Sequence, residues 1–116
     1  LENNGTPPPL AGSAVHGPGL SGNTPFAPVT TSPATEFHLY AVEGDSPSIR
    51  YYVDNTLHYS VSRGLVQTKG AWVFDQPFFV VLNLAVGGHF DGDPQSNSIL
   101  PATMLIDYVR VYRLTN

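Results

Sequence analysis

Two short segments in which apolar and polar residues alternate, joined by an Asp-Asn pair, constrain the fold of this chain most. In residues 48–54, SIRYYVD, every second residue is Ile, Tyr or Val, so these side chains share one face of an extended strand. Residues 56–62, TLHYSVS, repeat the pattern. Asp54 and Asn55 suit the tight turn between them, because Asp and Asn tolerate a left-handed backbone. The sequence therefore predicts a β-hairpin in which Ile49, Tyr51 and Val53 share one face of the first strand, and Leu57, Tyr59 and Val61 share one face of the second.

Further strands are expected on both sides of this hairpin. Residues 35–43, TEFHLYAVE, precede it across a Gly-Asp-Ser-Pro turn. Residues 77–86, PFFVVLNLAV, are almost continuously apolar, as in a strand covered on both faces. Residues 103–113 provide a last strand, and one more is expected around residues 11–16.

Glycine and proline divide the chain into short pieces. There are 11 of each, and they concentrate in residues 6–33 and 87–101, which we expect to form turns and loops. No ten-residue window places apolar residues at helical spacing, and no internal repeat is visible. The sequence therefore predicts an all-β fold, an antiparallel jelly-roll β-sandwich.

Charge and cysteine content narrow the classes of partner. The formal net charge is -4 and the few basic residues form no cluster, which argues against binding to nucleic acid. Without cysteine, the chain has neither disulfides nor thiolate metal sites. No apolar run reaches the roughly 18 residues that a membrane-spanning helix needs, and no signal-peptide pattern is present. We expect one small soluble domain, cut from a longer product because the chain begins at Leu1 and its one methionine is Met104.

Five stretches, taken in order, carry a family resemblance: VHGPGLSG, FHLYAVEGD, SIRYYVDN, WVFDQPFFVVLNLAVGG and MLIDYVRVYR. Together they resemble glycoside hydrolase family 16, the laminarinases and related β-1,3(4)-glucanases. The resemblance implies a concanavalin A-like jelly roll, of which residues 1–116 would be the C-terminal half, starting inside the catalytic motif. It further implies hydrolysis of internal β-glucosidic bonds in β-1,3(4)-glucans by a retaining mechanism, in a secreted protein.

Glu2 is the catalytic residue that the resemblance implies. The family's catalytic strand reads E-x-D-x-x-E, and the opening LENNG resembles its end, so that Glu2 matches the second glutamate, the general acid/base. Retaining enzymes pair this acid with a carboxylate nucleophile roughly 5 to 5.5 Å away, which by this alignment precedes Leu1. We therefore expect the isolated chain to be inactive. Taken without the resemblance, Glu2 is an exposed terminal glutamate.

Three residues are implied to bind the substrate. Asn83 stands in the middle of the apolar segment 77–86, where the family places an asparagine that touches bound glucan; the alternative is an amide that bonds a loop backbone. Trp72 is the sole tryptophan and offers a flat ring for sugar stacking, with core packing as the alternative. His16 lies where the family's chain contributes to the cleft, and a structural histidine is the alternative.

A structural calcium ion is the one metal that the resemblance implies, with no cofactor for the chemistry. Asp107 stands among apolar residues at the position of a calcium-binding aspartate, with further ligands expected outside this chain. An ion pair with Arg50 or Arg110 is the alternative. The remaining histidines show no zinc or copper spacing. The loop with Asp91 and Asp93 is interpreted as a polar rim of the cleft, because the glutamate of a calcium loop is missing: the stretch reads HFDGDPQSN.

Two departures from the family bear on the substrate. Gly44 and Ala85 stand where aromatic residues are usual, which removes stacking surface and favours laminarinase-like over licheninase-like activity. A non-catalytic glycan-binding jelly roll is the alternative function. The expected partners are a β-glucan polysaccharide and either the missing N-terminal half of the domain or a second copy of the chain, because half a sandwich exposes apolar surface and strand edges.

Overall fold

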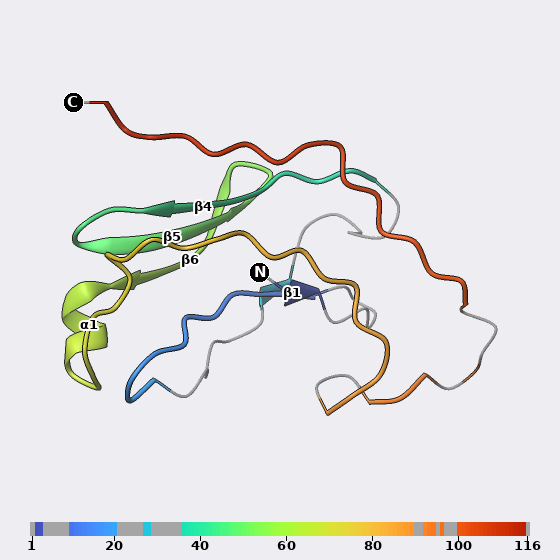
Figure 1. The fold of residues 1–116 in the computed structure, drawn as a ribbon, viewed down its shortest axis with the longest axis horizontal. Coiled ribbons are helices and arrows are strands. Elements are labelled where there is room, and N and C mark those ends of the chain that lie inside the picture. The colour runs from blue at the N-terminus through green and yellow to red at the C-terminus, as the bar shows by residue number, and fades with distance from the viewer. Residues whose placement is uncertain are drawn as a thin grey trace. The chain divides into compact units, whose positions relative to one another are not determined.

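The structure is a computed structural model that describes residues 2–3, 10–20, 27–28, 36–89, 92–94, 96 and 100–115. The chain divides into two units, Leu1–Phe78 and Phe79–Asn116, and every strand and helix found lies in the first (Figure 1). That unit holds two three-stranded antiparallel sheets, in the orders β1-β2-β3 and β4-β5-β6. The elements are β1 (Glu2–Asn3), β2 (Leu10–Gly12), β3 (Ala27–Pro28), β4 (Tyr40–Gly44), β5 (Ser48–Val53), β6 (Thr56–Ser62) and α1 (Arg63–Gln67).

The predicted hairpin is confirmed as β5 and β6, with its turn at the expected place. Asp54 and Asn55 have φ angles of 50° and 64°, the left-handed conformation that a two-residue hairpin turn requires. One detail of the prediction is wrong: Leu57 does not share a face with Tyr59. The register shifts at this point, Leu57 pairing with Tyr52 and Tyr59 with Tyr51. This β-bulge leaves His58 as the extra residue and turns Leu57 outward, where it is 52% exposed.

Strand β4 joins the hairpin as expected, but it starts later than predicted. It pairs with β5 in an unbroken register from Tyr40 opposite Val53 to Gly44 opposite Ile49. The expected Gly-Asp-Ser-Pro turn is present, with Asp45 and Ser48 bonding each other through both backbone groups at 3.0 and 3.4 Å. Thr35, the predicted first residue of this strand, lies outside the described residues.

The other sheet is short. The strand expected around residues 11–16 is found as β2, which pairs with β1 on one side and with β3 on the other. Beyond β2, Ser13 and Val15 are buried, Ala14 is half-buried and His16 is exposed.

The core of the first unit forms where residues 13–15 meet the inward face of β5 and β6. The Tyr51 hydroxyl donates a hydrogen bond of 3.1 Å to the carbonyl oxygen of Ala14, which ties the two chain segments together. Tyr51 and Tyr59 pack at the margin of the core with ring centroids 5.9 Å apart. The buried core residues are Val15, Ile49, Val61, Val66 and Trp72.

A single-turn helix follows β6, and no helical stripe of apolar residues predicted it. Ser62 caps α1: its hydroxyl accepts a hydrogen bond of 3.1 Å from the Leu65 backbone N–H. Val66, which is fully buried, anchors the helix to the core. None of the described residues belongs to a helix with the length and apolar character needed to cross a membrane.

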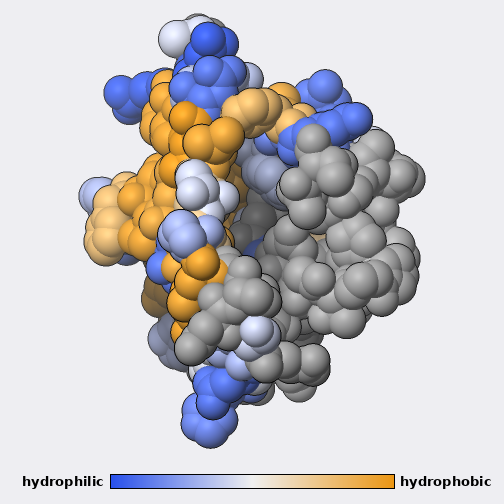
Figure 2. All heavy atoms as spheres, turned by 90° about the vertical axis from the view of Figure 1, so that its right-hand side faces the viewer, coloured by the Kyte–Doolittle hydropathy of each residue, from blue (hydrophilic) through white to orange (hydrophobic). Residues whose placement is uncertain are grey.

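The second unit corrects the expectation of two long strands. Neither residues 77–86 nor residues 103–113 take part in a ladder within the described part of the chain, although Figure 1 draws each as a drawn-out trace. A strand is held by hydrogen bonds to a partner, so an apolar run without a partner is not a strand. Large apolar side chains of both segments, among them Phe79, Val81, Leu105 and Tyr112, are exposed, and apolar surface of this kind is visible in Figure 2.

Candidate functional site

Glu2 lies on β1 with an exposed side chain. The register places Glu2 opposite Gly12 of β2, and β1 is an edge strand of this short sheet. Both Ala11 and Gly12 of β2 are buried, whereas Glu2 is exposed.

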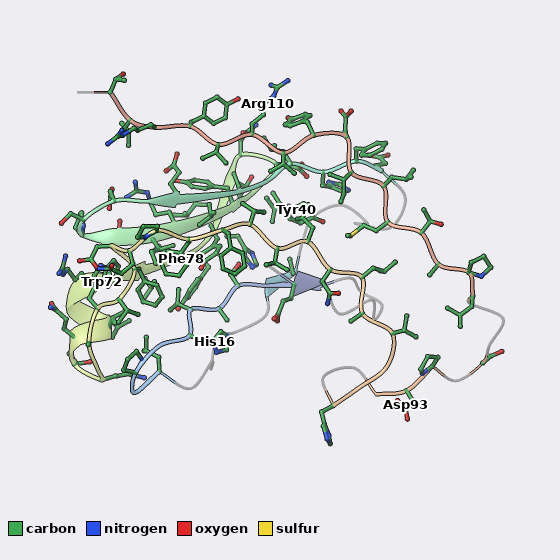
Figure 3. The ribbon with its side chains drawn as sticks, viewed as in Figure 1. His16, Tyr40, Trp72, Phe78, Asp93 and Arg110 are labelled. Atoms are coloured by element: carbon green, nitrogen blue, oxygen red, sulfur yellow. The ribbon has the colours of Figure 1, made fainter. Side chains whose placement is uncertain are left out.

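His16 is exposed and follows β2 four residues after Gly12. His16 stands just before a tight turn closed by the Leu20 N–H to Gly17 carbonyl bond of 2.9 Å. Figure 3 shows its ring at the margin of the chain.

Trp72 belongs to the core cluster and is 9% exposed. Phe74 meets its ring edge to face at a centroid distance of 5.1 Å, and the Arg63 guanidinium carbon lies 5.5 Å from the ring centroid. The low exposure of the ring favours packing as the role of this side chain, which Figure 3 labels. Its indole N–H has no hydrogen-bond partner among the described residues.

Asn83 and Asp107 lie in the second unit, and both are exposed. Water therefore solvates the Asp107 carboxylate, which removes the cost that a buried charge would carry. Arg50, one of its two expected partners, is taken by Glu43 and Asp45, and the Arg110 guanidinium lies over the Tyr108 ring at 4.2 Å. No group of three or more His, Cys, Asp or Glu side chains that could hold a metal ion occurs among the described residues.

The loop after residue 86 forms an open hollow of about 270 Å³ lined by Gly88, His89, Gly92 and Asp93. The Gly88 N–H donates to Asp93 at 3.4 Å, and the Gly92 N–H donates to the Gly88 carbonyl at 2.9 Å. Gly87, Gly88 and Gly92 all have positive φ. Asp91, the other acid of this loop, lies outside the described residues.

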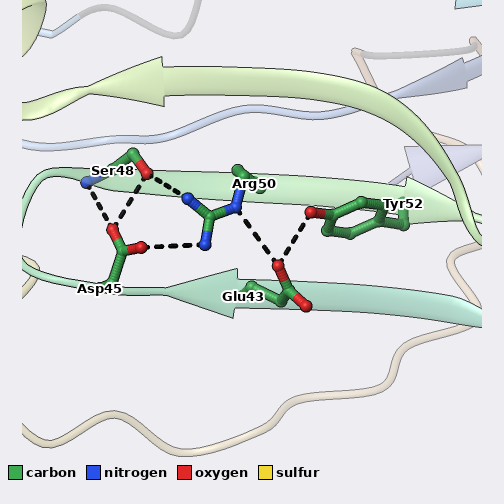
Figure 4. A network of polar contacts seen from close by, with 5 residues as sticks. All are labelled: Glu43, Asp45, Ser48, Arg50 and Tyr52. Carbon is green, nitrogen blue, oxygen red and sulfur yellow. Dashed lines mark hydrogen bonds and ion pairs between the residues drawn. The ribbon is translucent and has the colours of Figure 1, made fainter. Parts of the chain in front are cut away.

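A polar network that the sequence analysis did not find covers the outer face of β4 and β5 (Figure 4). Arg50 is its centre: its Nε donates to Glu43 at 3.2 Å, its Nη2 to Asp45 at 2.9 Å and its Nη1 to the Ser48 hydroxyl at 2.7 Å. Tyr52 donates to the same Glu43 oxygen at 2.8 Å. The length of the Gly-Asp-Ser-Pro turn was the available signal, because it sets the register that places Glu43 opposite Arg50.

The ionisation of this network follows from its hydrogen bonds. The Tyr52 hydroxyl, followed by Arg50, lowers the pKa of the Glu43 carboxyl. Arg50, followed by Ser48, lowers the pKa of Asp45, and the two carboxylates together raise the pKa of Arg50. These acids stay ionised and neutralise the arginine, which makes the network a clamp between two strands rather than a proton-transferring site.

A second polar pair fixes the chain that enters β4. The His38 Nδ1 lies 2.7 Å from an Asp54 carboxylate oxygen, and the other oxygen accepts a hydrogen bond of 3.0 Å from the Leu39 N–H. Nearby, burial and then the Asp54 charge raise the pKa of Tyr40. These contacts connect residues 38–39 to the hairpin turn, so their role is structural.

Comparison with known proteins identifies a matching family and several relatives of the chain. The family described as Glycosyl hydrolases family 16 matches residues 1–110. A glucan endo-1,3-beta-glucosidase A1 from Niallia circulans is 42% identical over 86 residues, which is 69% of this chain and 13% of that protein. A beta-glucanase from Rhodothermus marinus is 41% identical over 87 residues, 68% of this chain and 29% of that protein.

A keratan-sulfate endo-1,4-beta-galactosidase from Sphingobacterium multivorum is 36% identical over 94 residues, 81% of this chain and 22% of that protein. The chain thus spans less than a third of the length of each of these relatives. No solved structure is significantly similar to the chain.

Proposed function

The chain belongs to glycosyl hydrolases family 16, and from this membership we propose that it is part of a glycosidase that hydrolyses internal β-glucosidic bonds of β-1,3(4)-glucans with retention of configuration. The observation that carries the proposal is the family match over residues 1–110, which includes an exposed glutamate at the expected end of the catalytic motif. Two relatives named as glucanases, at 42% and 41% identity, support a glucan as the substrate.

The fold that we propose for the whole domain is a concanavalin A-like jelly-roll sandwich, with residues 1–116 as its C-terminal part. Two antiparallel sheets in the first unit, one of which packs its β5 and β6 strands into the core, support this architecture. The apolar segments 77–86 and 103–113 would become strands once neighbouring strands provide their hydrogen-bond partners.

Glu2 is the proposed acid/base. As an acid, it protonates the glycosidic oxygen while a carboxylate nucleophile attacks the anomeric carbon, and the leaving sugar departs with that proton. As a base, Glu2 then takes a proton from the water that releases the second product. The nucleophile stands earlier in the family motif, at a position outside these 116 residues, so the complete reaction is proposed for a protein that supplies it.

Asn83 and His16 are the proposed sugar contacts, since both are exposed and carry hydrogen-bonding groups. Trp72 is proposed to pack in the core and to stabilise the segment that follows it, without contacting the sugar. Arg50 and Arg63 both form ion pairs with carboxylates, which supports a neutral glucan over a sulfated one.

Two further properties come with the proposal. Asp107 would supply one ligand of a structural calcium ion whose other ligands lie outside the described residues, and no cofactor takes part in the chemistry. Secretion is proposed from the family membership alone.

Stereochemistry is the direct test of the reaction class. Proton NMR of laminarin digested by the protein that carries this chain should show the β-anomer of the new reducing end first, before mutarotation produces the α-anomer. Initial release of the α-anomer would contradict a retaining mechanism. Laminarin that binds without being cleaved would favour the alternative, a non-catalytic glycan-binding jelly roll.

A further inference from the structure

Arg63, the first residue of α1, contacts two other stretches of the first unit. Its backbone N–H donates a hydrogen bond of 2.8 Å to the carbonyl oxygen of Pro47, in the turn between β4 and β5. Its Nη2 lies 3.6 Å from an Asp75 carboxylate oxygen, and its guanidinium carbon lies 5.5 Å from the centroid of the Trp72 ring. Arg63 therefore connects the residues that follow α1 to the β4–β5 turn.

Both ends of the Arg63–Asp75 ion pair have further support. Ser62 caps α1 directly before Arg63, and the fully buried Val66 holds the same helical turn in the core. The other Asp75 oxygen accepts a hydrogen bond of 3.5 Å from the Gln76 side-chain amide. Because the pair is partly exposed, it adds little to the stability of the fold by itself. Its contribution is to the placement of residues 72–75.

Aromatic contacts continue from Trp72 to the last residue of the first unit. Phe74 meets Trp72 edge to face at a centroid distance of 5.1 Å, and Phe74 and Phe78 stack at 6.3 Å. Figure 3 labels Trp72 and Phe78 on the segment that follows α1. Residues 72–78 take part in no ladder among the described residues, so the contacts that place this stretch are those of its side chains.

The segment that begins at residue 77 carries Asn83, the proposed sugar contact. In the complete domain we propose that residues 77–86 form a strand, and successive side chains of a strand point to opposite faces. A slip of one residue would turn Asn83 from the sugar to the opposite face. An almost continuous apolar run determines its own register weakly, because apolar side chains stand on both faces at every register. A fixed contact just before this segment can supply the register that its composition does not.

We propose that Arg63 is a positioning residue: by holding Trp72 and Asp75, it sets the register in which residues 77–86 enter their sheet and so directs Asn83 to the substrate. This inference rests on the proposed function, because the sugar contact of Asn83 is part of that proposal. Arg63 itself does not touch the sugar, since its guanidinium is engaged by the Asp75 carboxylate and the Trp72 ring.

Removal of the Arg63 charge tests this role in the full-length protein that carries this chain. Arg63→Met keeps a long apolar side chain but loses both the ion pair and the cation beside the ring. The KM for laminarin should rise about three- to tenfold while kcat stays within about twofold, because a misplaced Asn83 weakens binding in the ground state and the transition state alike. Arg63→Lys keeps the charge and should recover most of the loss.

Lys69→Met, which removes a nearby charge that is outside these contacts, is the matched control and should leave KM unchanged. An unchanged KM in Arg63→Met, or an equal rise of KM in Lys69→Met, overturns the inference.

A double-mutant cycle separates this inference from the proposed function. Asn83→Ala should raise the KM for laminarin by itself, and Arg63→Met should raise it no further in the Asn83→Ala background, because Arg63 acts through Asn83. Additive effects of the two substitutions overturn the inference and leave the sugar contact in place. An unchanged KM in Asn83→Ala contradicts the sugar contact itself, and with it this inference.

Discussion

Gly70 and Pro18 approach so closely that a Cβ atom added to Gly70 would collide with the carbonyl oxygen of Pro18. The contact is reciprocal, because a Cβ on Gly19 would strike the carbonyl oxygen of Lys69. Gly19 also has a φ of 73°, which disfavours any other residue. The turn that follows His16 is thus held directly against the end of the α1 segment, and two glycines make that contact fit.

The first prediction compares two glycines of the α1 region. Gly70→Ala should destabilise the chain by about 1–3 kcal/mol, since backbone must move to admit the methyl group. Gly64→Ala, inside α1 with nothing within 4 Å of the added Cβ, should stabilise it by about 0.5–1 kcal/mol. Urea unfolding followed by circular dichroism measures both. Equal effects of the same sign would show that the close contact is absent.

The second prediction concerns Trp72, for which the sequence left sugar stacking and core packing open. The buried, edge-packed indole leads us to expect that Trp72→Phe lowers the unfolding free energy by about 1–3 kcal/mol and leaves laminarin binding unchanged. Isothermal titration calorimetry at a temperature where the variant is folded provides the check. Lost binding with undiminished stability would assign the ring to the substrate instead.

The third prediction follows from the lowered pKa values of Glu43 and Asp45. A carboxyl with a lowered pKa in the folded state adds stability that is present above its unfolded pKa, near 4, and is lost as the pH falls through the folded value. The melting temperature of the chain should therefore fall below about pH 4. Arg50→Gln should flatten this part of the curve, and Lys69→Gln, a charge change elsewhere on the surface, should not. If the melting temperature of Arg50→Gln fell below pH 4 as steeply as that of the unsubstituted chain, the network would not contribute to the stability of the fold.

The fourth prediction concerns calcium. Because the described residues include no cluster of three metal-binding side chains, millimolar Ca²⁺ should leave the melting temperature of this chain almost unchanged. The complete domain, in which ligands from outside the described residues join Asp107, should be stabilised by Ca²⁺ in a way that Asp107→Asn abolishes. A large shift in the chain alone that disappears in Asp107→Asn would reveal a self-contained site.

The features that could be predicted from the sequence are those that depend on residues close together along the chain. Alternation and the Asp54-Asn55 turn were enough for the β5–β6 hairpin, because both signals are local. The bulge at His58 escaped prediction, since a register shift has no clear signature in TLHYSVS and reverses the face of Leu57. The helix α1 escaped as well, because one turn is too short to show an apolar stripe.

The predictions that failed concern partners distant in sequence. Residues 77–86 and 103–113 read as strands by composition, yet strand formation requires a neighbour that composition does not provide. The Arg50 network was missed for a related reason, as it appears once the register of β4 and β5 is known. For the candidate site, the resemblance indicated Glu2, and the structure added its place on an edge strand, opposite Gly12.

The role of Glu2 as acid/base is the central claim, and leaving-group dependence tests it most directly. In the full-length protein that carries this chain, Glu2→Gln should reduce kcat on laminarin by about 10²–10⁴, because the departing sugar oxygen loses its proton donor. Formation of the glycosyl-enzyme from an aryl β-glucoside with an acidic phenol, measured as the burst of phenol released, should stay near the wild-type rate, since that leaving group needs no proton. Glu36→Gln, another exposed glutamate, serves as the control. Equal losses on both substrates in Glu2→Gln, or no loss on laminarin, would contradict the assignment.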